Sequence, residues 1–398
     1  MPQSETPPAP IIALACAEPS MTPRAEAFRA AWSDGPAPDL TETGRIWSKT
    51  RVAPDALLLF AGATPGTQAI ARMERLRDTF RAAGVDVPLI VETRKSADLA
   101  LSRPASAFVS PALTEETLVA RIRETIRQSV RMEEARLRRA VLGPLPVDRE
   151  ALRHPSGSLM VAGAGQAAAT ALTQAGLSLP IEGALTADAV CRRLTQTPHR
   201  ALFVDMPLDR TCDILQKVNA DPRLASLPVL AMATADDEVD TLAAAGCGDV
   251  VLRDADPADL GIRLRTLLLA GARRHLADAL LRRFRALYLE NGAELPAEAF
   301  DAYFARLTAI VKARGRAPLV RTLGDLHPAP LPPRAANDDP LAPVVGDPIR
   351  STILAASREE DFVARVSGRG DMIVLRDAQA LAGLSRRVGA IIATTSFV

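Results

Sequence analysis

Three stretches in the middle of the chain decide the fold: HRALFVDMPL at residues 199–208, LPVLAMAT at 227–234 and AAGCGDVVLRDADPADLGIRL at 244–264. Each stretch holds a short apolar run, and segments with helical periodicity separate the runs. Such runs are typical of buried parallel strands in an alternating βα chain. We therefore predict an α/β fold with parallel sheets for this part of the chain.

The same pattern occurs twice. The second set of runs is Leu159–Ala162, Ala201–Val204, Val229–Met232 and Val250–Leu252, and the first is Ile11–Ala15, Ala56–Phe60, Pro88–Val91 and Phe108–Val109. Matching runs are about 140 to 148 residues apart, so one α/β unit is used twice in the first 270 residues or so.

These copies resemble response-regulator receiver domains, the second more closely. The resemblance puts the phosphoacceptor at Asp205, and in the first copy PDALLLFAGATPG (54–66), VPLIVET (87–93) and ASAFVSPALTEETLVARI (105–122) occupy the corresponding places. It implies two flavodoxin-like, doubly wound parallel sheets.

Receiver chemistry needs an acidic pair for Mg²⁺, an aspartate that takes the phosphoryl group and a lysine that pairs with it. The second copy has Gly163 and Ala164 at the acidic pair, Ala233 at the hydroxyl position and Arg253 at the lysine. In the first copy Phe60 replaces the acceptor, and Ala15 and Cys16 replace the acids. We expect neither copy to be phosphorylated, which leaves Asp205 as a possible remnant phosphoacceptor.

Two apolar stripes predict long helices that extend the last helix of each copy. One runs through Leu118, Ile122, Ile126, Val130, Leu137 and Val141, and the other through Leu269, Leu276, Leu280, Phe284 and Leu287. The second helix suggests a stalk. It could pair with the same helix of a second chain, or it could pack against its own chain. Residues 327–343, HPAPLPPRAANDDPLAP, are too rich in proline for a helix or a central strand and predict a loop.

After this loop, REEDFVAR at 358–365 and SGRGDM at 367–372 resemble the GGDEF domain of diguanylate cyclases, over roughly residues 290–398. With the paired receivers, the chain resembles the receiver–receiver–GGDEF proteins of the PleD and PopA group, closest in character to the PopA type. The resemblance makes REED an RxxD site for cyclic di-GMP.

The residue types fit such a ligand. Arg358 can offer a fork of donors to a phosphate or a guanine edge, and Asp361 can accept from guanine N–H groups. Arg386, on the next predicted helix, aligns with a further guanine-holding arginine of the family. An exposed ion pair between Arg358 and Asp361 is the alternative interpretation.

Cyclase catalysis needs two metal ions held by carboxylates. By the resemblance, Arg369 and Gly370 stand at hairpin positions where cyclases have acids. Thr322 stands where cyclases have the metal-binding aspartate of the first strand. Asp371 and Asp325 lie near these positions but out of register. Asn337 and Asp347 are possible remnants of a guanine-binding site, with a spacing one residue too long. We expect no catalytic residue and no metal, in a degenerate GGDEF domain that lacks its closing strands and last helix.

Composition excludes several classes of protein. Lys plus Arg number 48 against 47 Asp plus Glu, so no global charge attracts nucleic acid. Four scattered cysteines and four histidines indicate no zinc or disulfide framework. The apolar stretch Ile11–Ala17 is too short to span a membrane. We expect a cytoplasmic location, and the PopA resemblance implies recruitment to the cell pole.

The sequence thus predicts three domains: a receiver with linker helix at 8–142, a receiver at 156–272, and a stalk with degenerate GGDEF domain at 273–398. We expect an inactive cyclase relative that has no cofactor, binds cyclic di-GMP as a regulatory ligand, dimerises through its receivers and contacts a protein partner. The resemblance implies a proteolysis adaptor in cell-cycle control. A weakly active cyclase and a ligand-free scaffold are the alternatives.

Overall fold

The computed structural model describes residues 11–17, 19–32, 39–40, 52–62, 67–82, 84–97, 99, 101, 104–143, 157–224, 226–290, 293–326 and 348–394. The chain folds as two compact units. The N-terminal unit holds residues 9–132 and 147–276, and the C-terminal unit holds 133–146 and 277–398. The two receiver-like copies lie in one unit, and the end of the first copy's last helix belongs to the C-terminal unit.

The first copy is a parallel five-stranded sheet in the order β2-β1-β3-β4-β5. Its strands are β1 (Ile12–Cys16), β2 (Asp39–Leu40), β3 (Ala56–Phe60), β4 (Leu89–Glu92) and β5 (Ala107–Val109). Its helices are η1 (Pro19–Met21), α1 (Thr22–Ala31), α3 (Thr67–Ala82) and α4 (Glu115–Leu142). All five residues of β3 are buried, as expected for a strand with both faces covered.

The second copy repeats this topology in the order β10-β9-β8-β6-β7. Its strands are β6 (Ser158–Gly163), β7 (Ile181–Ala184), β8 (His199–Asp205), β9 (Val229–Ala233) and β10 (Asp249–Leu252). Its helices are α6 (Gln166–Gln174), α7 (Ala187–Gln196), α8 (Leu208–Ala220), α9 (Asp236–Ala244) and α10 (Pro257–Arg285). Numbered within each copy, both sheets read 2-1-3-4-5, the flavodoxin-like order, which confirms the predicted fold class.

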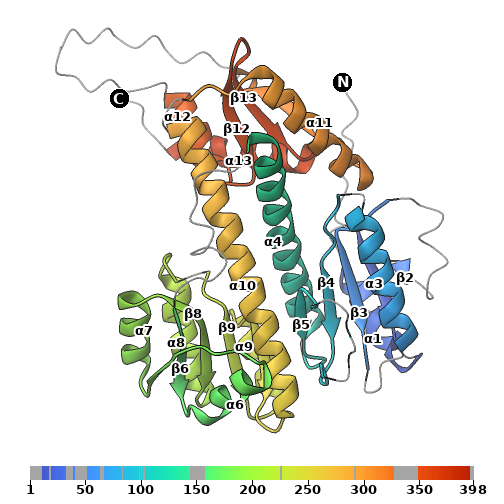
Figure 1. Cartoon of the computed structure of the whole chain (residues 1–398), viewed down its shortest axis with the longest axis vertical. Coiled ribbons are helices and arrows are strands. Elements are labelled where there is room, and N and C mark those ends of the chain that lie inside the picture. Colours follow the sequence, from blue (N-terminus) through green and yellow to red (C-terminus); the bar gives the residue numbers. More distant parts are fainter. Residues whose placement is uncertain are drawn as a thin grey trace. The chain divides into compact units, whose positions relative to one another are not determined.

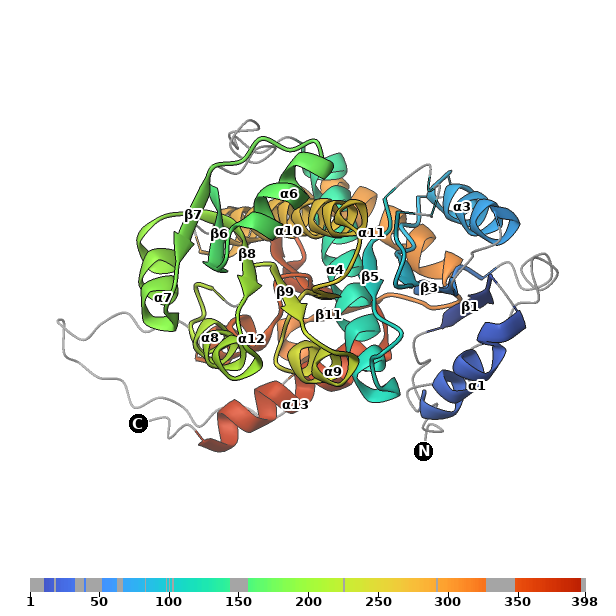
Figure 2. The ribbon, with the colours of Figure 1, turned by 90° about the horizontal axis from the view of Figure 1, so that it is seen from below.

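Helices cover both faces of the second sheet. Figure 2 shows α6 and α10 on one face and α8 and α9 on the other. The two faces bury separate cores, one containing Leu159 and Leu264 and the other containing Met160 and Ile214. This alternation of neighbouring strand residues between two cores explains why each predicted run is almost wholly apolar.

The two copies pack against each other within the N-terminal unit. Their edge strands β5 and β10 lie beside each other. The Oδ1 atom of Asp259 accepts from the Ser96 hydroxyl at 3.1 Å, and that of Asp240 accepts from the Thr114 hydroxyl at 2.9 Å. Arg263 donates to the Thr93 carbonyl. The copies therefore share a polar interface as well as a continuous hydrophobic core.

The C-terminal unit is built on an antiparallel sheet in the order β11-β13-β12 (Figure 1). Its elements are the π-helical turn η2 (Ala286–Glu290), α11 (Ala297–Ala313), β11 (Leu319–Thr322), η3 (Leu323–Leu326), α12 (Pro348–Ala356), β12 (Phe362–Val366), β13 (Gly370–Leu375) and α13 (Ala378–Thr394). One core packs α11 on the sheet, and a second packs α12 and α13 on it.

The first predicted stripe lies on a single helix, α4, that serves both units. Leu118, Ile122 and Ile126 pack in the core of the N-terminal unit. Leu137 and Val141 pack in the core of the C-terminal unit together with α11. The first stripe therefore contributes to the hydrophobic cores of both units.

Candidate functional site

The RxxD segment forms a short, closed turn between α12 and β12. The backbone N–H of Arg358 donates to Oδ2 of Asp361 at 2.8 Å, and the backbone N–H of Asp361 donates to the carbonyl of Arg358 at 3.1 Å. These two bonds join the ends of the four-residue motif and fix its backbone. The predicted pair is thus brought together, although through the Arg358 backbone and not through an ion pair of side chains.

The two side chains differ in exposure. Arg358 is exposed, and its guanidinium makes no hydrogen bond or ion pair with another described residue. The Asp361 side chain is only 9% exposed. Burial raises the pKa of Asp361, partly opposed by its bond to the Arg358 N–H. The site therefore has an accessible guanidinium donor beside a carboxylate acceptor that is partly shielded from water. These two groups suit a charged ligand that carries N–H groups.

The arginine next to the predicted third residue contacts the turn. Arg386 is exposed on α13, whereas Arg387 brings its Nη2 to 3.5 Å from Oδ2 of Asp361. The Nε of Arg387 also donates to the carbonyl of Ala356 at 2.7 Å. Successive helical residues point about 100° apart, so a shift of one position decides which arginine faces the turn.

A small cavity of about 10 Å³ lies beside the turn, and Arg138, Arg285, Tyr288, Arg358 and Asp361 are among its lining residues. A space of this size holds at most about one water molecule. A dinucleotide therefore has to lie against the exposed side of the turn in this conformation.

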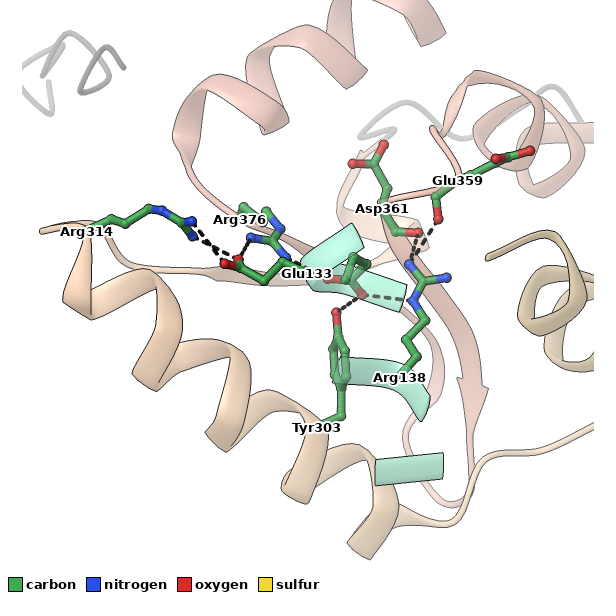
Figure 3. Close-up of polar contacts among 8 residues, drawn as sticks. Glu133, Arg138, Tyr303, Arg314, Glu359, Asp361 and Arg376 are labelled. Carbon is green, nitrogen blue, oxygen red and sulfur yellow. Dashed lines mark hydrogen bonds and ion pairs between the residues drawn. The ribbon is translucent and has the colours of Figure 1, made fainter. Parts of the chain in front are cut away.

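A buried cluster of charged side chains adjoins the turn (Figure 3). Its centre is the pair Glu133 and Glu134 at the end of α4, both almost wholly buried. Arg314 donates to both carboxylate oxygens of Glu133, at 2.8 and 2.9 Å. Arg376 spans the pair, 2.5 Å from Glu133 and 3.1 Å from Glu134. The hydroxyl of Tyr303 donates to Glu134 at 2.7 Å.

Sequence reasoning missed this cluster. The Glu-Glu pair in α4 precedes the RxxD motif by more than 220 residues, and helix periodicity assigned only the apolar residues of α4 to a core. The sequence held one signal for this cluster. Glu133 and Glu134 are adjacent acids close to Leu137, a buried residue of the core.

The hairpin expected to carry catalytic acids is present without them. β12 and β13 pair so that Val366 faces Gly370, which places Arg369 in the turn. Arg369 donates to both carboxylate oxygens of Asp301, at 2.7 and 2.8 Å, and lies over the Phe300 ring. The hairpin tip is thus tied to α11.

The two remaining acids have other partners. Asp371 pairs with Arg365 at 3.2 Å across the hairpin. Asp325 accepts from the backbone N–H of Thr322 at 2.9 Å and caps the turn after β11. Among the described residues, no group of three or more His, Cys, Asp or Glu side chains could hold a metal ion. Asn337, Asp347 and the proline-rich loop 327–343 lie outside the described residues.

In the second copy, Asp205 ends β8 beside Arg253, with Nη2 2.9 Å from Oδ1. Gly163 has a φ of +99°, and a Cβ there would lie 2.0 Å from the carbonyl oxygen of Asp205. An acidic side chain at position 163 is therefore incompatible with this backbone.

The corresponding edge of the first sheet holds a residue that the sequence did not suggest. Glu92, at the end of β4, is 1% exposed and lies 3.2 Å from Arg24 of α1. Burial raises the pKa of Glu92 to about 7, although Arg24 opposes the rise. The carboxyl end of β4 thus holds a buried carboxyl group beside an arginine.

No described helix combines the length and the apolar character that a membrane-spanning helix needs.

Comparisons with known proteins find similarity to response regulators at low identity. No protein-family model matches the sequence, and no curated protein matches it significantly. Among solved structures, a response regulator from Chloroflexus aurantiacus is 18% identical, with a TM-score of 0.26, over 28% of this chain and 98% of its own. A response regulator in red light signalling of R. palustris is 15% identical, with a TM-score of 0.25, over 28% and 91%. A two-component system response regulator/GGDEF domain protein is 14% identical, with a TM-score of 0.26, over 66% and 98%. Identities and scores this low say nothing about ligand or activity.

Proposed function

We propose that this chain is a signalling protein of the response-regulator type that binds cyclic di-GMP at the RxxD turn and does not synthesise it. The observation that carries the proposal is the closed turn, with an exposed, unengaged Arg358 guanidinium beside a mostly buried Asp361 carboxylate. A guanidinium fork suits a phosphate or a guanine edge, and a carboxylate suits guanine N–H donors.

The charges around the turn favour an anionic ligand. Arg387 lies 3.5 Å from Asp361, and Arg138, Arg285 and Arg358 line the adjoining cavity. The two phosphates of cyclic di-GMP would meet a surface rich in arginine. Loss of synthesis is proposed because the hairpin positions that need acids carry Arg369 and Gly370, and the surviving acids are engaged in local structure.

The downstream step rests on the resemblance to the PopA type. We propose that the ligand changes contact with a protein partner, of which a proteolysis adaptor at the cell pole is the expected class. Dimerisation through the receivers remains a prediction. Because β5 and β10 already lie beside each other in one chain, a dimer would have to use other receiver surfaces.

The deciding experiment is calorimetric titration of the purified full chain with cyclic di-GMP and, separately, with GTP. We expect saturable binding of cyclic di-GMP that weakens at least roughly tenfold in Arg358→Ala, since a charge-assisted hydrogen bond contributes about 1.5 to 3 kcal/mol. Arg321→Ala, an exposed arginine on β11, is the matched control and should bind as the wild type does. No binding to the wild type at about 100 micromolar ligand, roughly −5.5 kcal/mol, would refute the proposal.

A further inference from the structure

Two arginines that are distant in sequence hold the backbone around the RxxD turn. Nη2 of Arg138, from α4, donates to the carbonyls of Glu359 at 3.0 Å and Asp361 at 3.2 Å. Nη1 of Arg285, from α10, lies 3.3 Å from the carbonyl of Ser357, and its Nη2 donates to the carbonyl of Leu354. Two side chains thus reach four carbonyls between positions 354 and 361, and the Ser357 hydroxyl also donates to the Leu354 carbonyl at 2.8 Å.

The carbonyls need these donors for a physical reason. Leu354 and Ser357 lie in the last turn of α12 and just after it, where helix carbonyls have no partner within the helix. Glu359 and Asp361 lie in the tight turn itself, where the backbone cannot satisfy every acceptor. An arginine fork can bind two such carbonyls at once and thereby fix their relative positions.

Arg138 is itself held in place (Figure 3). Its Nε donates to Oε1 of Glu134 at 2.8 Å, and its guanidinium lies 5.3 Å from the centre of the Phe362 ring. Its side chain is 4% exposed. Glu134 is in turn held by Tyr303 and Arg376. The donor that reaches the turn is therefore fixed before any ligand arrives, which is the condition for a preorganised site.

We infer that Arg138 and Arg285 are positioning residues of the ligand site: they set the turn conformation in which Arg358 and Asp361 face one ligand. This inference rests on the proposed function. It adds that the affinity for cyclic di-GMP depends on the ends of α4 and α10, the helices that close the two receiver-like copies. The ligand requires the turn conformation that these helix ends hold. Ligand binding and the positions of the helix ends are then thermodynamically linked.

The test uses Arg138→Met and Arg285→Met in the full chain. These substitutions keep an unbranched side chain and remove every donor to the carbonyls. Arg314→Met is the matched control, because it removes a buried arginine from the same cluster, where Arg314 pairs with Glu133. Arg138→Lys and Arg285→Lys form a second set that retains one cationic donor, for use if a methionine variant does not fold.

Two measurements are made on each variant. Amide hydrogen exchange of the segment 357–363, without ligand, reports whether the N–H groups of Arg358 and Asp361 remain in their bonds. Calorimetry with cyclic di-GMP reports affinity. We expect both methionine variants to exchange faster in this segment and to bind at least roughly tenfold more weakly, with the lysine variants intermediate. Arg314→Met should resemble the wild type in both measurements.

The outcomes separate this inference from the proposed function. If the folded Arg138 and Arg285 variants match the wild type in exchange and affinity, the positioning role is wrong even though the ligand binds. If Arg314→Met loosens the turn equally, the effect belongs to general stability and the inference is also overturned. If the wild type binds no cyclic di-GMP, the proposed function fails, and with it the ligand-positioning role.

Discussion

Arg253 pairs directly with Asp205, with Nη2 2.9 Å from Oδ1. The pair engages the carboxylate that the sequence predicts as a possible remnant phosphoacceptor. On the neighbouring strand, Gly163 approaches the Asp205 backbone too closely for any side chain. The backbone at position 163 therefore leaves no room for one of the two acids that hold Mg²⁺ in receivers.

We predict that acetyl phosphate with Mg²⁺ leaves the intact mass of the protein unchanged. Asp205→Asn should preserve the oligomeric state and partner binding, because the side chain has a local partner and no metal site. Intact-mass spectrometry and size-exclusion chromatography check both points. A stable phosphoryl adduct that Asp205→Asn abolishes, together with a shift in oligomeric state, would restore the protein to phosphorelay control.

For cyclase activity the prediction is negative. GTP with Mg²⁺ or Mn²⁺ should yield no cyclic di-GMP, because the GGDEF resemblance places Thr322 and Arg369 at metal-ligand positions and Asp371 is paired with Arg365. Chromatography of the nucleotides after a long incubation is the measurement. Turnover that disappears in Asp371→Asn would show that the hairpin register has been misread.

The sequence predicted the sheets well where a strand is buried on both faces. The eight apolar runs all became strands, because covering helices on both faces demand continuous apolar residues. It missed β2 and β7, which each lie at one edge of their sheet. In β7, Ile181 is 41% exposed and its neighbours include Glu182 and Gly183, so no apolar run marks the strand.

The candidate site was predictable only in part. Arg358 and Asp361 are three positions apart, so a local motif predicts that they share one turn. Arg138 and Arg285 reach the same turn from helices 220 and 73 positions earlier than Arg358, and no local pattern encodes such a contact. The choice of Arg387 over Arg386 depends on the phase of α13, which a misalignment of one residue changes.

Arg263 is predicted to be a principal stabilising residue between the two receiver-like copies. Its Nη1 lies 2.8 Å from Oδ1 of the buried Asp249, its Nη2 donates to the Thr93 carbonyl, and it lies over the Phe108 ring. Arg263→Met leaves a buried carboxylate without its counter-charge, which costs about 3 to 5 kcal/mol of unfolding free energy.

Urea denaturation measures this loss. The double variant Arg263→Met with Asp249→Asn removes the stranded charge and should recover much of it. A loss below about 1 kcal/mol, as for an exposed pair, would contradict the role given to Arg263.

Glu92 should make the N-terminal unit less stable as the pH rises. Its pKa is raised from 4.5 in the unfolded chain to about 7 in the fold, chiefly by burial. Below pH 4.5 both states carry the proton. Between these two values only the folded state keeps it, so the free energy of unfolding falls with rising pH by up to about 3 kcal/mol. Glu92→Gln should remove this slope between about pH 5 and 7 in denaturation experiments. An identical slope in the variant would mean that another group titrates.

Glu133 should act in the opposite direction in the C-terminal unit. Burial alone would raise its pKa, but Arg376 and Arg314 lower it from 4.5 to about 2. The folded pKa is depressed, so the stabilisation is fully present above the unfolded pKa of 4.5 and is lost as the pH falls through about 2. Glu133→Gln should lower the unfolding free energy at neutral pH by about 3 kcal/mol, because Arg314 and Arg376 lose the buried carboxylate with which both pair. The difference in unfolding free energy between wild type and variant should shrink from about pH 4.5 downward.

Glu124→Gln, on the exposed part of α4, is the control and should unfold as the wild type does at every pH. A difference between wild type and Glu133→Gln that stays constant down to pH 2 would show that packing, and not the charge of Glu133, holds α4 in this unit.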